Sequence, residues 1–302
     1  MLTVRRRAER KASVKATRQR VVRVARGGGR WFPAGAAELG GMVSGFIEDA
    51  AMALPAADRV AVVAAPHAGY MYSGAVAGYA FRALRDHSQP ETLVILGFAH
   101  RGGFPGVALM DGDAIRTPIG ESPLDTEAAE ILIKAAPCVF PDYRPHDGEH
   151  SAENQVPFAQ VALPGVRLVI GLVGDHEAET VRSLARALRE LDGRRPIAVV
   201  ASTDLLHDPD WDRVAVTDRK TLDLIAGLRV DALERSWSFG NQVCCGIGPV
   251  LTGMTLAADL GATRGTVLRY RNSGDDFPDS RGQWVVGYGA VAFAVPPRAA
   301  RP

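Results

Sequence analysis

Six short apolar segments recur along the 302-residue chain, and they restrict its possible folds more than any other feature of the sequence. They consist mainly of Val, Ile, Leu and Ala, without the alternation of apolar and polar residues that marks a half-buried strand. Continuous apolar runs of this length are typical of strands covered on both faces. The predicted strands cover residues 59–65, 92–97, 167–173, 197–201, 266–270 and 284–295.

Helical patterns lie between these segments, so strands and helices alternate along the chain. The predicted helices cover residues 75–86, 126–135, 177–191, 218–227 and 248–261. Alternation of this kind indicates an α/β fold with a largely parallel sheet between layers of helices. In such folds the functional site lies beyond the carboxyl ends of the strands.

The first 30 residues carry most of the excess basic charge. They contain eleven Lys or Arg residues and one acidic residue, Glu9, whereas the rest of the chain has 24 bases and 33 acids. Large apolar residues are scarce there, and three glycines follow at 27–29. We expect residues 1–28 to form a disordered or loosely attached basic extension, and residues 29–302 to form the folded domain.

The basic extension allows several roles. Contact with nucleic acid or with an anionic membrane surface would suit its charge, and a scarcity of acids is also typical of transit peptides. A leader without a role explains the composition equally well, and we favour that interpretation. The mildly acidic remainder of the chain gives no reason to expect nucleic-acid binding.

Hydropathy and cysteine usage favour a cytoplasmic protein. The sequence has no run of about eighteen apolar residues, so we expect no membrane span, and no apolar signal-peptide segment follows the basic arm. Three cysteines, two of them adjacent, do not make a disulfide framework. We therefore expect a reducing compartment.

Two histidines directly follow predicted strands. His67 follows the first strand in APHAGYMYSG, and His100 follows the second in ILGFAHRG, 33 residues later. That separation matches a strand–helix–strand unit, whose right-handed crossover brings both strand ends to the same edge of the sheet. Neutral imidazole is the commonest metal ligand and also titrates near neutral pH. Either histidine alone is more often a turn residue, but the pair indicates a metal or acid–base site.

Other polar side chains belong to the same edge or to nearby loops. His207 follows the fourth strand, with Asp204 three residues before it, and His150 lies in a loop with Glu149 and Glu153. Asp204 would also serve as a helix cap, and the two glutamates would also serve as surface charges. The remaining histidines lie in polar stretches and are predicted to be solvated: His87, His146 and His176.

A third metal ligand could come from Cys245, which stands just before a predicted helix in NQVCCGIGPVLTGM. A helix N-terminus lowers the pKa of a thiol, and the resulting thiolate is a good ligand for iron, copper or zinc. A cysteine at such a position is otherwise most often a small buried apolar residue. The residues alone therefore leave a metal-assisted site and an acid–base site both open.

Seven motifs, in order, resemble the MEMO family, whose microbial members are called AmmeMemoRadiSam system protein B. The motifs extend from residue 29 to about residue 295: GRWFPAGAAEL, APHAGYMYSG, ILGFAHRG, EHSAENQVPF, STDLLH, CGIGPV and VVGYGA. The family is similar to class III extradiol dioxygenases, the non-heme iron enzymes that open catechol rings. The resemblance implies a single α/β domain with a central, largely parallel mixed sheet covered by helices.

The resemblance also implies site residues. MEMO proteins carry a metal pocket made by two histidines and a cysteine, which by motif position are His67, His100 and Cys245. Asp204 and His207 are implied to face this pocket as supporting or acid–base groups, and His150 to act beside them, mainly by orienting its loop.

The chain departs from the family pattern at two places. Phe98 and Ala99 stand where Pro followed by Ser or Asn is usual, which alters the pocket wall rather than the ligands. Cys244 adds a second thiol, and the Cys-Gly-x-Gly-Pro register selects Cys245 as the ligand.

The identity of the third metal ligand affects which reaction we expect. A class III dioxygenase holds Fe(II) with two histidines and a carboxylate. A thiolate in place of the carboxylate favours iron or copper redox chemistry over ring cleavage. The first hypothesis is a metal-dependent oxidoreductase that holds Fe(II), or Cu, and acts on a small molecule, with His207 as the acid–base residue oriented by Asp204.

Two other functions remain open. The chain could be a non-catalytic scaffold or binding module that takes a peptide, with AMMECR1-like and radical-SAM proteins as partners. It could also be a zinc-dependent hydrolase, because two histidines, a cysteine and a water make a catalytic zinc site.

Overall fold

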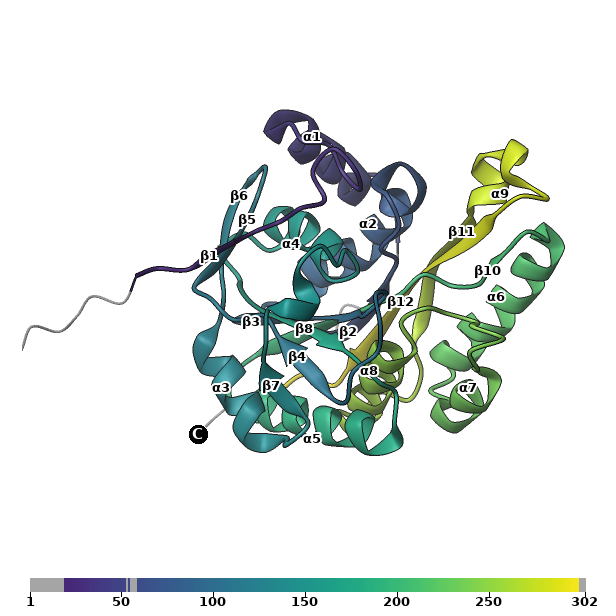
Figure 1. The fold of residues 1–302 in the computed structure, drawn as a ribbon. Coiled ribbons are helices and arrows are strands. Elements are labelled where there is room, and N and C mark those ends of the chain that lie inside the picture. Colours follow the sequence, from purple (N-terminus) through teal and green to yellow (C-terminus); the bar gives the residue numbers. More distant parts are fainter. Residues whose placement is uncertain (1–18, 53, 55–58, 299–302) are drawn as a thin grey trace, which may run out of the picture.

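The computed structural model describes residues 19–52, 54 and 59–298, and its centre is a sheet of nine strands. Strands β2, β9, β3 and β8 run parallel in the middle of the sheet, and β12 is antiparallel to β2 (Figure 1). The strand order is β10 (His207–Asp208), β12 (Val285–Val295), β2 (Arg59–Ala65), β9 (Ile197–Ser202), β3 (Thr92–Phe98), β8 (Arg167–Val173), β4 (Val107–Leu109) and β7 (Val139–Pro141), and β11 (Thr266–Asn272) also pairs with β12.

Helices cover both faces of this sheet (Figure 1). Consecutive residues of β2 therefore face different cores. Val62 packs into the core with α5 and α8, whereas Val63 packs into the core with α1 and α2. Each face of the strand thus has its own core, which explains the continuous apolar pattern. One face carries α1 (Ala36–Glu48), α2 (Tyr70–His87) and α4 (Val156–Ala162), and the other carries α3 (Thr126–Ala135), α5 (Ala178–Arg194) and α8 (Ile247–Asp259).

The remaining helical elements lie at the ends of the sheet and in its loops. Near β10 and β11, on the right of Figure 1, lie α6 (Trp211–Ala226) and α9 (Ser273–Asp276), with α7 (Val230–Ser236) below them. The described residues also contain three short 3-10 turns: η1 (Arg144–His146), η2 (Glu153–Gln155) and η3 (Pro278–Ser280).

The predicted α/β fold is confirmed, with all six predicted strands and all five predicted helices present. Two helices begin earlier than the sequence indicates. Helix α2 begins at Tyr70 rather than residue 75, directly after the turn at Gly69. Helix α6 begins at Trp211 rather than residue 218, because the side chain of Asp210 accepts a hydrogen bond from the backbone of Arg213 and caps the helix.

A second, three-stranded sheet was not predicted, and it alters the expected start of the domain. It consists of β1 (Val22–Val24), β5 (Ala114–Thr117) and β6 (Gly120–Pro123), with β1 parallel to β5. Residues 19–28 therefore do not match the prediction of a loose extension, since Val22–Val24 form a strand that pairs with β5. Residues 1–18, the rest of the predicted extension, lie outside the described residues.

The segment after β1 is fixed to the domain by a buried carboxylate. Glu153 accepts hydrogen bonds from the backbone nitrogens of Arg26 and Gly27, at 2.8 and 2.6 Å. A Cβ atom on Gly27 would lie 2.5 Å from the ring of Phe32, so the close approach requires glycine. This contact brings Arg30 and Trp31 towards the loop that contains His150.

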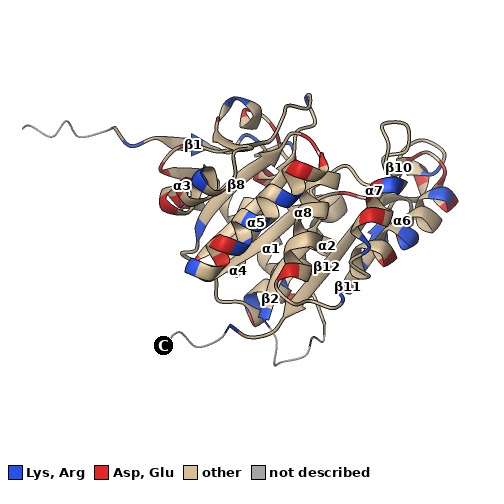
Figure 2. Ribbon diagram, turned by 90° about the horizontal axis from the view of Figure 1, so that it is seen from below, with Lys and Arg blue, Asp and Glu red and all other residues tan. Residues whose placement is uncertain are grey.

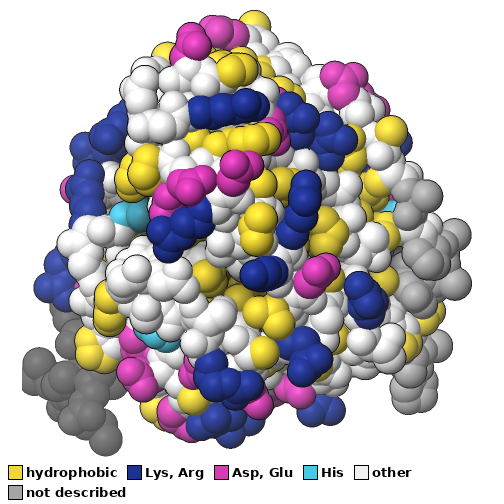
Figure 3. All heavy atoms as spheres, turned by 90° about the vertical axis from the view of Figure 1, so that its right-hand side faces the viewer, with side chains coloured by type: hydrophobic (Ala, Val, Ile, Leu, Met, Phe, Trp, Pro, Cys, Tyr) yellow, Lys and Arg dark blue, Asp and Glu magenta, His cyan; other side chains and the backbone are white. Residues whose placement is uncertain are grey.

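Charged residues lie mainly on the helices and loops, and the central strands are largely free of them (Figure 2). On the face shown in Figure 3, hydrophobic, basic and acidic side chains are interspersed. Among the described residues, none of the helices combines the length and the hydropathy needed to cross a bilayer.

Candidate metal centre

Three potential metal ligands converge at the carboxyl edge of the parallel strands. His67 follows β2, His100 follows β3, and Cys245 precedes α8, and one ligating atom of each lies within 4.8 Å of the others. The Cys245 Sγ atom is 3.2 Å from Nε2 of His67. A tetrahedral ion bonded to one sulfur and one imidazole nitrogen holds these atoms about 3.5 Å apart. The spacing of the cluster therefore fits a single ion.

The hydrogen bonds of Ser202 determine which nitrogen of His67 carries the proton. Ser202 Oγ donates its single proton to the carbonyl of Ser151 at 2.6 Å, and it accepts from Nε2 of Gln155 at 2.8 Å. It must therefore also accept the bond from Nδ1 of His67, which is 2.9 Å away. The Nε2 atom of His67 is left without a proton and faces Cys245. Burial, followed by the charge of His100, lowers the pKa of His67 well below its usual value, so the ring is neutral.

Glu149 performs the corresponding role for His100. Its Oε1 atom lies 2.9 Å from Nδ1 of His100, and its Oε2 atom accepts from the backbone nitrogen of the same residue. A carboxylate on Nδ1 fixes the ring and leaves Nε2 as the free donor, an arrangement found around many metal-binding histidines. Burial raises the pKa of Glu149, but the bonds with His100 and Ser151 outweigh it and lower the pKa to about 2.

Cys245, rather than Cys244, lies beside the two histidines. Cys244 is fully buried in the apolar core, whereas 7% of Cys245 is exposed. The backbone nitrogen of Asp204 donates to Sγ of Cys245 at 3.2 Å. The end of β9 passes very close to the turn at Gly246. A Cβ atom on Gly246 would lie 2.3 Å from the carbonyl oxygen of Ser202, so this position requires glycine.

The prediction that the helix lowers the pKa of this thiol is wrong. Burial, followed by the charge of Asp204, raises the pKa of Cys245 well above its usual value. A helix N-terminus stabilises a thiolate by about 1 kcal/mol, which lowers the pKa by less than about one unit, whereas complete burial raises the pKa by several units. A cation in contact with this thiol would favour its ionised form.

Asp204 does not orient His207, contrary to the sequence-based prediction. Its Oδ1 atom accepts from the backbone nitrogens of His67 at 2.7 Å and Ala68 at 3.3 Å, and no bond to His207 occurs in the described part of the chain. Asp204 instead fixes the turn that carries His67. Burial raises the pKa of this carboxyl group to about 6.

His207 lies in β10, where it pairs with Val286 of β12. Its Nε2 atom is buried and has no hydrogen-bond partner among the described residues. Burial, followed by the charge of His100, lowers the pKa of His207 to about 4. The ring is therefore neutral near pH 7.

His150 lies closer to the cluster than a loop-orienting role requires. Its ring stacks on Trp31, with centroids 3.9 Å apart, and on His100, with centroids 4.6 Å apart. Burial, followed by the charge of His100, lowers the pKa of His150 to about 4. The prediction did not include Trp31, although it stands in the first of the family-like motifs, GRWFPAGAAEL. Ser202 and Gln155 were also missed, since no periodic pattern marks them.

The cluster borders a cavity of about 550 Å³. Aromatic side chains form much of its wall, and His100, His150, Asp204 and His207 line it as well. The aromatic wall consists of Trp31, Tyr72, Phe277, Trp284 and Tyr288. Cys245 lines an adjacent cavity of about 330 Å³, which shares His100 and His207 with the first. The cavities are large enough for a small organic molecule beside the three clustered side chains.

The three histidines predicted to be solvated differ from one another. His87 and His176 are partly exposed, as expected for residues outside a site. The prediction for His146 is wrong, because only 4% of it is exposed and its Nε2 atom lies 3.0 Å from the carbonyl oxygen of Ala108. Burial lowers the pKa of His146 to about 4, and this residue supports the fold rather than the site.

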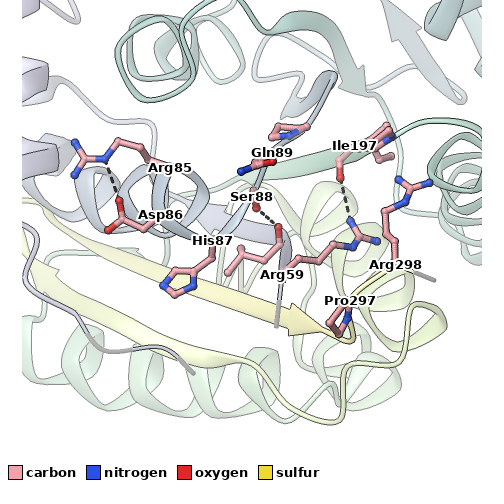
Figure 4. A pocket seen from close by; sticks show the side chains of 12 residues that line it. Arg59, Arg85, Asp86, His87, Ser88, Gln89, Ile197, Pro297 and Arg298 are labelled. Atoms are coloured by element: carbon pink, nitrogen blue, oxygen red, sulfur yellow. Dashed lines mark hydrogen bonds and ion pairs between the residues drawn. The ribbon is translucent and has the colours of Figure 1, made fainter. Parts of the chain in front are cut away.

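A separate cavity of about 480 Å³ lies at the opposite edge of the sheet, where β2 and β9 begin (Figure 4). Its arginines already have partners, because Arg59 binds Asp192 and the carbonyl of Ile197, Arg85 binds Asp86, and Arg298 binds Asp192. Its lining includes one histidine and no cysteine. The chemistry-bearing side chains thus lie at the other edge.

The fold and the cluster define a single-domain α/β protein with three potential metal ligands at the carboxyl edge of a parallel sheet. The Memo-like protein family matches residues 23–292, and the chain belongs to this family.

Comparisons with individual proteins support the same family assignment. A MEMO1 family protein of Methanopyrus kandleri is 36% identical over 240 residues, which cover 76% of this chain and 82% of that protein. A MEMO1 family protein of Methanothermobacter thermautotrophicus is 38% identical over 239 residues, covering 76% and 83%. A crystal structure of an uncharacterized protein from Escherichia coli K12 is similar with a TM-score of 0.51 at 14% identity, covering 78% of this chain and 100% of that one. That similarity supports the fold alone.

Proposed function

We propose that the chain is a metal-dependent oxidoreductase that acts on a small aromatic molecule. In this proposal Nε2 of His67, Nε2 of His100 and Sγ of Cys245 hold one ion, Fe(II) foremost and Cu as the next choice. The observation that carries the proposal is the convergence of these three donors, two of them with a free lone pair, beside an aromatic cavity.

The donor set fits a redox-active ion. Imidazole suits iron and copper, and thiolate increases electron donation to either metal. When bound, such an ion supplies one-electron redox chemistry at the wall of the cavity. Three protein ligands leave further coordination positions open for a substrate.

The other side chains position the substrate and move protons. The aromatic wall, including Trp31 and Tyr288, offers flat surfaces on which an aromatic ring can stack. His207, neutral and with an unpartnered Nε2 atom, is proposed to accept a proton from the substrate. Asp204 keeps the turn at His67 in place through its two backbone bonds.

Elemental analysis of anaerobically purified protein tests the proposal. The expected result is about one iron or copper ion per chain. Cys245→Ser is expected to lose most of that metal, and Cys138→Ser, which changes a cysteine outside the cluster, is expected to retain it. Oxygen uptake with catechol should then depend on the metal. Wild-type protein without iron or copper, or equal metal in both variants, contradicts the proposal.

A zinc-dependent hydrolase is the second candidate, because three protein ligands with an open position also describe a catalytic zinc site. Tightly bound zinc with metal-dependent ester or amide hydrolysis would favour it. A scaffold acting with AMMECR1-like and radical-SAM partner proteins is the third candidate. Partner binding that survives His67→Ala in a metal-free protein would favour that role.

We also infer a cytoplasmic location. All three cysteines are free, which suits a reducing compartment and a site that needs a reduced thiol.

A further inference from the structure

A group of arginines lies on the far side of the Trp31–His150 stack. Arg26, Arg30 and Arg101 line a cavity of about 250 Å³, together with both members of the stack. Arg30, Trp31 and His150 also line the aromatic cavity described above. The basic cavity and the aromatic cavity therefore meet at Arg30, Trp31 and His150, and the Arg30 side chain borders both.

The acidic side chains near these arginines are largely engaged elsewhere. Asp147 pairs with Arg26 at 2.9 Å. Glu149 bonds with His100 and backbone nitrogens, and Glu153 accepts from the backbone of residues 26 and 27. Within the described residues, neither Arg30 nor Arg101 pairs with a carboxylate. The guanidinium groups of Arg30 and Arg101 are thus left without a carboxylate partner, although the lining as a whole holds as many acidic as basic side chains.

The structure also fixes where these two guanidinium groups lie. Arg101 donates to the carbonyl oxygen of Asp147 at 3.1 Å. Its group packs against the chain at Gly148, where φ is +76° and a Cβ atom would lie 2.9 Å from Nη2. Arg30 lies over the ring of Trp31, 5.1 Å from its centroid. Both arginines are held at the rim by local contacts that leave donors free.

We propose that Arg30 and Arg101 bind the carboxylate of an aromatic ligand whose ring occupies the aromatic cavity. This inference rests on the proposed function, since it assigns an anionic group to the substrate of the same site. The planar fork of guanidinium donors matches a carboxylate. Three carboxylates also line the basic cavity, so a singly charged group is repelled less than a doubly charged phosphate.

Calorimetric titration with simple probes tests the proposal. Benzoate carries the ring and the charge, benzamide carries the ring alone, and phenyl phosphate carries the larger charge. Benzoate is expected to bind at least about tenfold more tightly than benzamide, since one hydrogen bond to a charged group contributes that much. Arg30→Gln and Arg101→Gln should each weaken benzoate binding by about tenfold and leave benzamide binding unchanged.

Controls separate this site from the metal centre. Arg182→Gln removes one positive charge from the exposed face of α5 and should change neither ligand. Because benzoate could also bind a metal ion directly, the titrations are repeated with Cys245→Ser, in which the contrast between benzoate and benzamide should persist.

Several results would overturn the proposal: benzoate binding no better than benzamide, an equal loss of both ligands in the arginine variants, or tighter binding of phenyl phosphate than of benzoate. The metal content of each sample distinguishes the two proposals. A metal-free wild type that retains the arginine-dependent contrast rejects the proposed function alone, and a metal-loaded wild type without the contrast rejects the anion site alone.

Discussion

Replacing Asp218 with asparagine removes a buried carboxyl group that supports the strand of His207. Asp218 lies in α6 and is fully buried. Its Oδ1 atom accepts from the backbone nitrogen of Leu206 at 3.0 Å, and its Oδ2 atom accepts from the hydroxyl of Tyr270 at 2.9 Å. Asparagine has the same shape. Its oxygen can keep the bond to Leu206, and its amide can donate to the Tyr270 hydroxyl.

The size and sign of the effect follow from the pKa of Asp218, which burial raises from 3.8 to about 7. Below about pH 4 the carboxyl group is protonated in both the folded and the unfolded chain. Between about pH 4 and pH 7 only the folded chain keeps the proton, so the free energy of unfolding decreases as the pH rises. The total decrease is about 4 kcal/mol, and above about pH 7 it is complete.

Urea unfolding across this pH range provides the assay. The difference in free energy of unfolding between Asp218→Asn and wild type is expected to rise by about 4 kcal/mol in favour of the variant from pH 4 to pH 7, then stay constant. Asp223→Asn, which changes an exposed residue of the same helix, should give a nearly flat difference. A flat difference for Asp218→Asn, within about 1 kcal/mol, would show that burial does not raise the pKa of this group.

Two further predictions concern the site. Glu149→Gln keeps an oxygen for Nδ1 of His100 but removes the charge, so metal affinity measured by chelator competition should fall about 10- to 100-fold. The control Glu179→Gln changes an exposed residue and should leave the affinity unchanged. Equal affinities in the two variants would contradict the role of Glu149. His207→Gln should retain the metal but reduce kcat with an active substrate by about 100-fold or more, because it removes the proposed proton acceptor. An unchanged kcat would exclude that role.

The two clustered histidines could be predicted to meet from the sequence because they stand at the ends of strongly patterned elements. Val62 and Val63 face opposite cores, so β2 reads as a continuous apolar run, and the first polar residue after it marks the edge of the sheet. The same logic applies to β3 and His100. Parallel pairing then brings both histidines to one edge, and no loop conformation needs to be known.

The residues that orient these histidines could not be predicted in this way. Glu149 and His150 lie in a loop with short 3-10 turns, and Trp31 lies in a segment that Glu153 fixes from more than a hundred residues away in the sequence. No period of 2.0 or 3.6 residues describes such segments. Asp204 shows the related limit, since its spacing from His207 suggests a contact that the chain direction does not produce.

Under the proposed function, the contact between Cys245 and His67 would let one arrangement suit the protein with and without a cation. Nε2 of His67 has no proton, because Nδ1 donates to Ser202, so a thiol at 3.2 Å can donate its proton to that nitrogen. A cation bonded to both atoms needs a separation of about 3.5 Å, which is only about 0.3 Å longer. Exchanging the shared proton for a metal ion thus requires little movement of the two side chains. Ser202 and Glu149 hold both imidazoles in the required tautomer beforehand, so little of the binding free energy would be spent on rearranging the site.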